Sequence, residues 1–336
     1  MKSPALLFLT LALPLAAHDD HGKPPAGKVV TSVQLTGNGR YRFETVPGWG
    51  ALPENANLGP THGGIAVDGQ GRVYVSTDAE HGIVRFSADG HFQKSFGPTT
   101  QTIHCLNLAQ EGDTEVLWGA ALGTEKVHKL SLEGEILLTI PNASTGEIPG
   151  GLKGVTAVVS APDGSVFIAC GYGSNRIHKL DATGKLLKTV GGQGQENGLF
   201  RTCHGLALDT RFESPRLLVC DRENRRLVHL DLELGFVEVH AVHLRRPCAV
   251  SLRGDLCAVA ELEGRVTLLG KHGYPLAFLG DQPDEHLWAQ HPVPESQLYD
   301  GLFTSPHGLS WDREGNLIVQ DWNAIGRVTM LKRLQN

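Results

Sequence analysis

The sequence predicts an all-β protein, a six-bladed β-propeller. The 336 residues include 41 Gly and 18 Pro and are only 20% charged, which is typical of many short strands joined by tight turns. A unit of about 40 residues recurs along the chain, a period typical of propeller blades. A D-x-x-G turn recurs within the unit, where glycine supplies the positive φ of a tight hairpin. A β-sandwich or a parallel β-helix is the competing architecture, and the repeat is too long for one β-helix coil.

Each copy of the unit has a strand-starting motif, a turn, a second strand ending in a polar residue, a turn and a third strand. The six copies begin at Thr61, Ile103, Val155, Cys203, Pro247 and Pro306. The last copy ends after three strands at Leu334, so we expect the alternating segment 41–46 to supply its fourth strand. This N-terminal strand would close the ring and remove free sheet edges. We therefore expect one propeller over residues 37–336, and a monomer.

Residues 1–17 have the pattern of a signal peptide. Lys2 is followed by an apolar run from Ala5 to Leu15 and by small residues suited to cleavage after Ala17. The run is too short to span a bilayer, and no other stretch is apolar enough, so we expect no membrane span. A buried N-terminal helix is the alternative. We expect a secreted or periplasmic protein in which residues 18–36 form a flexible leader.

Charge and cysteine content narrow the possible partners and cross-links. The net charge of −6 gives no reason to expect a nucleic-acid partner. An even number of cysteines in an exported chain permits disulfides, whereas cysteines inside apolar strand runs and at strand starts favour buried free thiols. The cysteines are Cys105, Cys170, Cys203, Cys220, Cys248 and Cys257. We expect most of them to be free.

The longest departure from the repeat runs from Gly280 to Ser305. It is polar, contains proline, and carries His286, Trp288 and His291. A long insertion of this kind is either a lid or binding loop, or a plain surface excursion.

Histidine dominates one position of the repeat. The first strand of every propeller blade lines the central channel, so residues at the same repeat position meet around one axis. At the head of that strand stand His62, His104, Thr156, His204, Cys248 and His307. A ring of imidazoles favours zinc or another divalent transition metal, and three neutral histidines with an open position are typical of a catalytic site. A fourth ligand, His62, would close the site and argue against catalysis; alternatively, each histidine only bonds a carbonyl.

The segments GYGSNRI, GKLLKTVGGQG and CDRENRR, with a histidine heading GLAL, resemble NHL repeats. Within these, the chain resembles the lyase domain of peptidylglycine α-amidating enzymes, best over Val155–Asp231 and more weakly over 103–130 and 306–331. The resemblance implies an NHL-type propeller in which zinc is held by His104, His204 and His307. It also implies that Tyr172 and Arg222 lie at the substrate.

The implied reaction is cleavage of a carbinolamide, with zinc lowering the pKa of the substrate hydroxyl and Tyr172 acting as general base. Arg222 and the metal would supply the positive charge that a basic tyrosine needs. The chain departs from the family where His62 replaces an arginine, Gly308 follows His307, and Gly173 follows Tyr172.

We therefore expect an exported, zinc-dependent, lyase-like enzyme that binds a small molecule or a peptide end in its axial channel. The alternative is a non-catalytic propeller that binds a protein, peptide or glycan. A sugar-lactone hydrolase would need a calcium site of Asp, Asn and Glu, which histidines at this register disfavour. Polar residues that end the second strands either orient the histidines or stabilise turns; they are Asp78, Asp221, Glu261 and Asp321.

Overall fold

A computed structural model of the chain describes residues 29–53, 56 and 58–335. The expected signal peptide and residues 18–28 of the expected leader lie outside the described residues. None of the helices in the described part has the length and apolar character needed to cross a bilayer.

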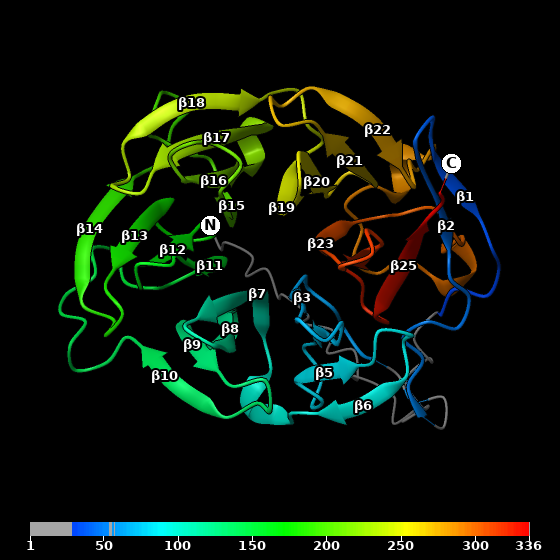
Figure 1. Ribbon diagram of the computed structural model, residues 1–336, viewed down its shortest axis with the longest axis horizontal. Coiled ribbons are helices and arrows are strands. Elements are labelled where there is room, and N and C mark those ends of the chain that lie inside the picture. Colours follow the sequence, from blue (N-terminus) through cyan, green and yellow to red (C-terminus); the bar gives the residue numbers. More distant parts are fainter. Residues whose placement is uncertain (1–28, 54–55, 57, 336) are drawn as a thin grey trace, which may run out of the picture.

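The described chain forms six antiparallel sheets arranged as a ring around a central axis (Figure 1). This confirms the predicted six-bladed propeller. The first five blades are β3–β6 (Ile65–Val67, Val73–Ser76, Ile83–Phe86, Phe92–Ser95), β7–β10 (Ile103–Glu111, Thr114–Ala121, Lys126–Leu130, Ile136–Ile140), β11–β14 (Ala157–Ser160, Val166–Cys170, Arg176–Leu180, Leu186–Gly191), β15–β18 (Cys203–Asp209, Arg216–Asp221, Arg226–Asp231, Phe236–Ala241) and β19–β22 (Pro247–Arg253, Leu256–Glu261, Arg265–Leu269, Pro275–Leu279). The sixth contains β23 (Pro306–Trp311), β24 (Leu317–Asp321) and β25 (Arg327–Arg333).

The sixth blade joins the two ends of the chain. Strand β2 (Tyr41–Thr45) pairs antiparallel with β25, with Phe43 opposite Arg333. The predicted closure by the N-terminal strand is therefore confirmed. Strand β1 (Leu35–Asn38) adds a fifth strand outside β2, so the sheet begins two residues before the expected start at 37.

The hydrophobic core lies between neighbouring blades. Second strands such as β12 are buried along their whole length, because a blade on each side covers them. At the closing blade, Phe43 is fully buried and its ring centroid lies 6.2 Å from that of Trp311. The core therefore fixes each blade against the next and holds the first strands around the axis.

All six cysteines are free thiols, and all but Cys105 are buried. The insertion before β23 contains two short 3-10 helices, η5 (Glu285–Leu287) and η6 (Glu295–Gln297). It packs around a small core of its own, formed by Leu287, Val293 and Leu298. It also reaches the axial face, where the rings of His291 and Trp322 lie 4.8 Å apart.

Candidate metal centre

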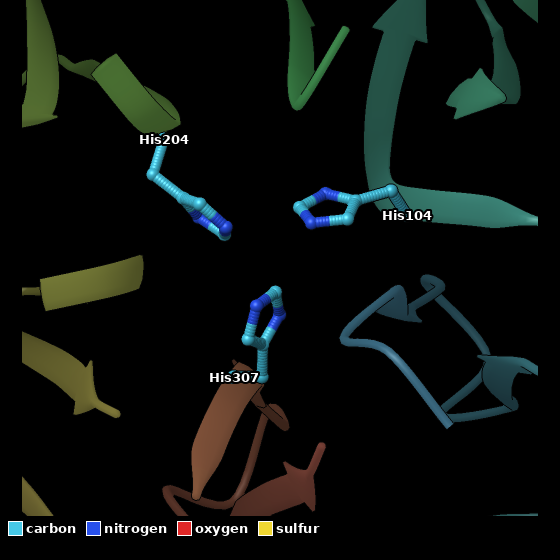
Figure 2. A group of neighbouring side chains, drawn as sticks. All are labelled: His104, His204 and His307. Carbon is cyan, nitrogen blue, oxygen red and sulfur yellow. The ribbon is translucent and has the colours of Figure 1, made fainter. Parts of the chain in front are cut away.

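Three of the predicted histidines meet on the propeller axis. His104 on β7, His204 on β15 and His307 on β23 point toward one another (Figure 2). Their ring centroids lie 4.6–4.9 Å apart. One nitrogen from each lies within 4.8 Å of the others, and all three side chains are buried. The sequence register therefore does bring these side chains together.

The three histidines come from alternate blades, the second, fourth and sixth. The blades between them carry Thr156, Cys248 and His62 at the same register. His104 Nδ1 lies 2.7 Å from the Thr156 carbonyl, and His204 Nδ1 lies 2.8 Å from the Cys248 carbonyl. A carbonyl only accepts, so each Nδ1 carries the proton and each Nε2 keeps its lone pair. This tautomer is the one that metal-binding histidines adopt.

The donor set fits a transition metal ion. Burial, with a smaller contribution from the Arg222 guanidinium, holds the pKa of all three imidazoles well below the usual 6.5. They are therefore neutral at neutral pH, which is the form that binds metals. His307 Nδ1 is buried and has no hydrogen-bond partner among the described residues. Zinc favours neutral imidazole nitrogens, and three of them leave a coordination position open for a substrate or water.

His62 lies beside this group of three histidines rather than within it. Its Nδ1 lies 2.7 Å from Asp78 Oδ2, and its ring centroid lies 5.1 Å from that of His104. The prediction that Asp78 ends a second strand is wrong: β4 ends at Ser76, and Asp78 lies two residues further on, at the side of His62. The three carboxylates that do end second strands bind loops instead: they accept backbone N–H groups of Arg201, Arg245, Thr304 and Ser305.

A second repeat position places Tyr172 and Arg222 at the histidines. The N–H of Tyr172 bonds the Gly154 carbonyl at 3.1 Å, and that of Arg222 bonds the Thr202 carbonyl at 3.0 Å. In both cases the acceptor stands two residues before a strand head. The same backbone bond positions Asp78, Leu122, Leu262 and Trp322 in the other blades. The backbone of the repeat therefore builds a second ring of six equivalent positions, and Asp78, Tyr172 and Trp322 lie beside histidines from it.

The Tyr172 hydroxyl lies at the centre of this arrangement. It is 2.8 Å from His204 Nε2 and 3.4 Å from His104 Nε2, and Arg222 Nη1 donates to it at 3.0 Å. Because His204 Nε2 carries a lone pair, the tyrosine donates its proton there. Tyr172 is 41% exposed overall, but desolvation of its hydroxyl raises the pKa to about 12, and Arg222 only partly opposes this. The phenol therefore keeps its proton unless more positive charge is added.

Sequence reasoning missed the charged pair behind Arg222. Glu223 accepts from Arg222 Nε at 2.9 Å and from Arg246 Nη2 at 2.7 Å, so it fixes the guanidinium against Tyr172. Trp322 was also missed, with its ring centroid 6.5 Å from that of His307. A signal existed, since Trp322 occupies the same repeat position as Tyr172.

Comparisons with known proteins support the fold. No protein-family model matches the chain, and no curated protein sequence matches it. The structure resembles a streptogramin B lyase (TM-score 0.56, 14% identity, 88% of this chain and 98% of that one). It also resembles virginiamycin B lyase from Staphylococcus aureus (0.53, 14%, 90% and 100%) and a gluconolactonase from Xanthomonas campestris (0.60, 13%, 92% and 98%).

At these identities the likeness shows the fold, a six-bladed β-propeller with lyase and lactonase neighbours. Since no family model matches, the NHL-type and amidating-lyase assignments stay predictions.

Proposed function

We propose that this protein is an exported, zinc-dependent enzyme of the lyase type, acting on a small molecule or a peptide end at the axial centre. One observation carries the proposal: three buried, neutral imidazoles from alternate blades converge, and two of them are oriented through Nδ1. His104, His204 and His307 would hold the metal. The solved structures of lyases and a lactonase with this fold support the proposal that the protein is an enzyme.

A bound zinc would polarise a substrate oxygen and lower its pKa. The chain supplies the proton-handling group, because the Tyr172 hydroxyl lies at the nitrogens that would bind the metal. Arg222 donates to the same oxygen and would stabilise it as a phenolate. Since the pKa of Tyr172 is about 12 beside Arg222 alone, a proton-accepting role depends on positive charge beyond this arginine.

The test is the metal content of residues 18–336, measured by mass spectrometry in the parent protein and in His204→Ala. We expect His204→Ala to lose one equivalent of zinc. His91→Ala is the matched control, because the His91 side chain is 83% exposed and does not stand at the strand-head position of the repeat. This variant should bind as much zinc as the parent protein. Equal zinc content in His204→Ala and the parent would show that the axial histidines do not hold the metal.

Turnover is then assayed on peptides that end in α-hydroxyglycine and on related carbinolamides. Cleavage by the zinc-loaded parent and none by His204→Ala is the expected result. A zinc-loaded protein that cleaves none of them would favour the non-catalytic propeller.

A further inference from the structure

We propose a second site for a divalent transition metal, at the rim of the fourth blade, formed by His229, Glu238 and His240. One ligand atom from each of these residues lies within 4.8 Å of the others. Glu238 and His240 also line a cavity of about 630 Å³ between the fourth and fifth blades. The proposal does not depend on the axial site, because the two clusters share no residue.

The strand register creates the cluster. His229 on β17 stands opposite Glu238 on β18. His240 follows Glu238 by two residues, at a register shift in the pairing of β17 with β18, and its ligand nitrogen lies within 4.8 Å of the ligand atoms of the other two residues. The ring centroids of His229 and His240 are 4.4 Å apart. Two adjacent strands thus present two imidazoles and one carboxylate together.

Hydrogen bonds orient the His229 imidazole toward one oxygen of Glu238. His229 Nε2 lies 3.0 Å from Asp209 Oδ2, and Arg211 holds that carboxylate at 2.6 Å. This leaves His229 Nδ1 facing Glu238 Oε1 at 3.0 Å. A carboxylate behind a ligating histidine is the usual outer shell of a metal site.

His240 completes the set. Its Nδ1 lies 3.7 Å from the same Glu238 oxygen. Its Nε2 is buried and has no hydrogen-bond partner among the described residues.

The second and third blades carry a histidine at the same repeat position but have no such cluster. His128 and His178 occupy the position of His229 in the second and third blades, and each bonds a threonine hydroxyl on the fourth strand, at 3.0 Å and 2.9 Å. A hydroxyl is therefore enough for a structural bond here. The fourth blade instead carries the carboxylate of Glu238 and adds His240. Both changes convert a structural pair into a ligand set.

Arg216 is the group that a metal would have to displace. Its Nη1 lies 2.8 Å from Glu238 Oε1 and 3.5 Å from His229 Nδ1. Its guanidinium lies 4.0 Å over the Phe212 ring, at the wall of the cavity. The arginine competes for the same carboxylate, so its removal should strengthen metal binding.

Two imidazoles and one carboxylate are typical of zinc and related divalent metals with open coordination positions. Here those positions would face the cavity. The competing explanation is an ion-pair network of Asp209, His229, Glu238 and Arg216 that binds no metal.

The experiment measures zinc binding by chelator competition in a His204→Ala background, where the axial site is disabled. We expect one equivalent to remain bound. Glu238→Thr should weaken it by about 100-fold or more, whereas removal of the competing cation in Arg216→Ala should tighten it by about tenfold. His272→Gln is the control, because His272 lines the same cavity outside the cluster; it should change nothing.

Glu238→Thr recreates the His–Thr pair of the second and third blades, so we expect it to fold; thermal unfolding with chelator checks this. His240→Gln is the second ligand variant and should weaken binding comparably. Absence of any bound equivalent in the His204→Ala background would overturn the proposal. Unchanged binding in both folded ligand variants would do the same. In the parent, the two bound zinc equivalents can be distinguished: His204→Ala removes the axial one, and Glu238→Thr removes the one at the rim.

Discussion

The role of a histidine in this chain depends on what its Nδ1 atom meets. His104 and His204 meet a carbonyl of the next blade, which keeps Nε2 free as an acceptor. His62 stands at the same register, yet its Nδ1 meets the Asp78 carboxylate. His178 meets a threonine hydroxyl on the neighbouring strand. A shared position in the repeat therefore sets where a histidine lies, while its hydrogen-bond partner sets its chemistry.

Tyr172→Phe should lower turnover by about 10²- to 10⁴-fold, the usual contribution of a general acid or base. The ring would stay in place and only the hydroxyl at His204 would be lost. Zinc content should not change, because the three histidines are untouched. Steady-state kinetics and metal analysis on the same preparation check this expectation.

Tyr274→Phe is the matched control for that variant. Its side chain is 74% exposed and lies at the rim cavity, so turnover should equal that of the parent. If Tyr172→Phe kept full turnover, the hydroxyl would have no part in the reaction. If it lost zinc, Tyr172 would be a structural support of the metal site.

The second strand of a blade often ends in a buried carboxylate that organises the approach to the axis. Asp321, at the end of β24, accepts from the backbone N–H groups of Thr304 and Ser305. These two residues lead directly into β23 and His307. Arg327 Nη1 lies 3.4 Å from the same carboxylate, and both side chains are almost completely buried. The element thus positions a strand-head histidine through the loop that precedes it.

Asp321→Ala should lower the free energy of unfolding by about 3–5 kcal/mol, the usual cost of leaving one member of a buried pair without its partner. Arg327 would remain buried and uncompensated, and two loop N–H groups would lose their acceptor. Denaturant unfolding monitored by tryptophan fluorescence measures the change.

Lys332→Ala is the comparison for an exposed pair. Lys332 lies 3.9 Å from Glu44 and is 61% exposed, so its loss should cost less than about 1 kcal/mol. Equal stability losses in the two variants would show that the Asp321–Arg327 pair is not what stabilises this loop.

At the scale of the whole molecule, the sequence predicted the ring and its closure, because both follow from repeat length and strand count. The last copy lacked a fourth strand, and β2 supplies it. Strand β1 was not predicted, because it pairs only with β2, at the outer edge of the sheet. Edge strands of this kind carry little apolar alternation from which they could be recognised.

The sequence predicted the axial site about as fully as it predicted the fold. The register indicated which histidines approach the axis, and Tyr172 and Arg222 share one repeat position. The register could not separate His62 from the other three, because the difference is the side-chain bond between His62 and Asp78. The rim cluster was invisible, since His229 and Glu238 lie on outer strands where cross-strand pairing, rather than sequence spacing, brings them together.

Buried neutral histidines throughout the ring should make stability fall as the pH is lowered. Their pKa values all lie below the usual 6.5, mainly because of burial; the residues are His104, His128, His178, His204, His240 and His307. The unfolded chain takes up protons below pH 6.5, whereas the folded chain does not, so protonation favours unfolding in that range.

His178 is outside both proposed metal sites, so its substitution tests how protonation of one buried histidine changes stability. It is fully buried, and burial lowers its pKa from 6.5 to about 4. Its share of the stability lost between pH 7 and pH 5 is about 2 kcal/mol. The loss over this range should therefore be smaller by about that amount in His178→Gln, measured by denaturant unfolding with chelator present. In His91→Gln, an exposed control, the loss should equal that of the parent. If the His178→Gln and parent curves ran parallel, proton uptake at buried histidines would not be the source of the pH dependence.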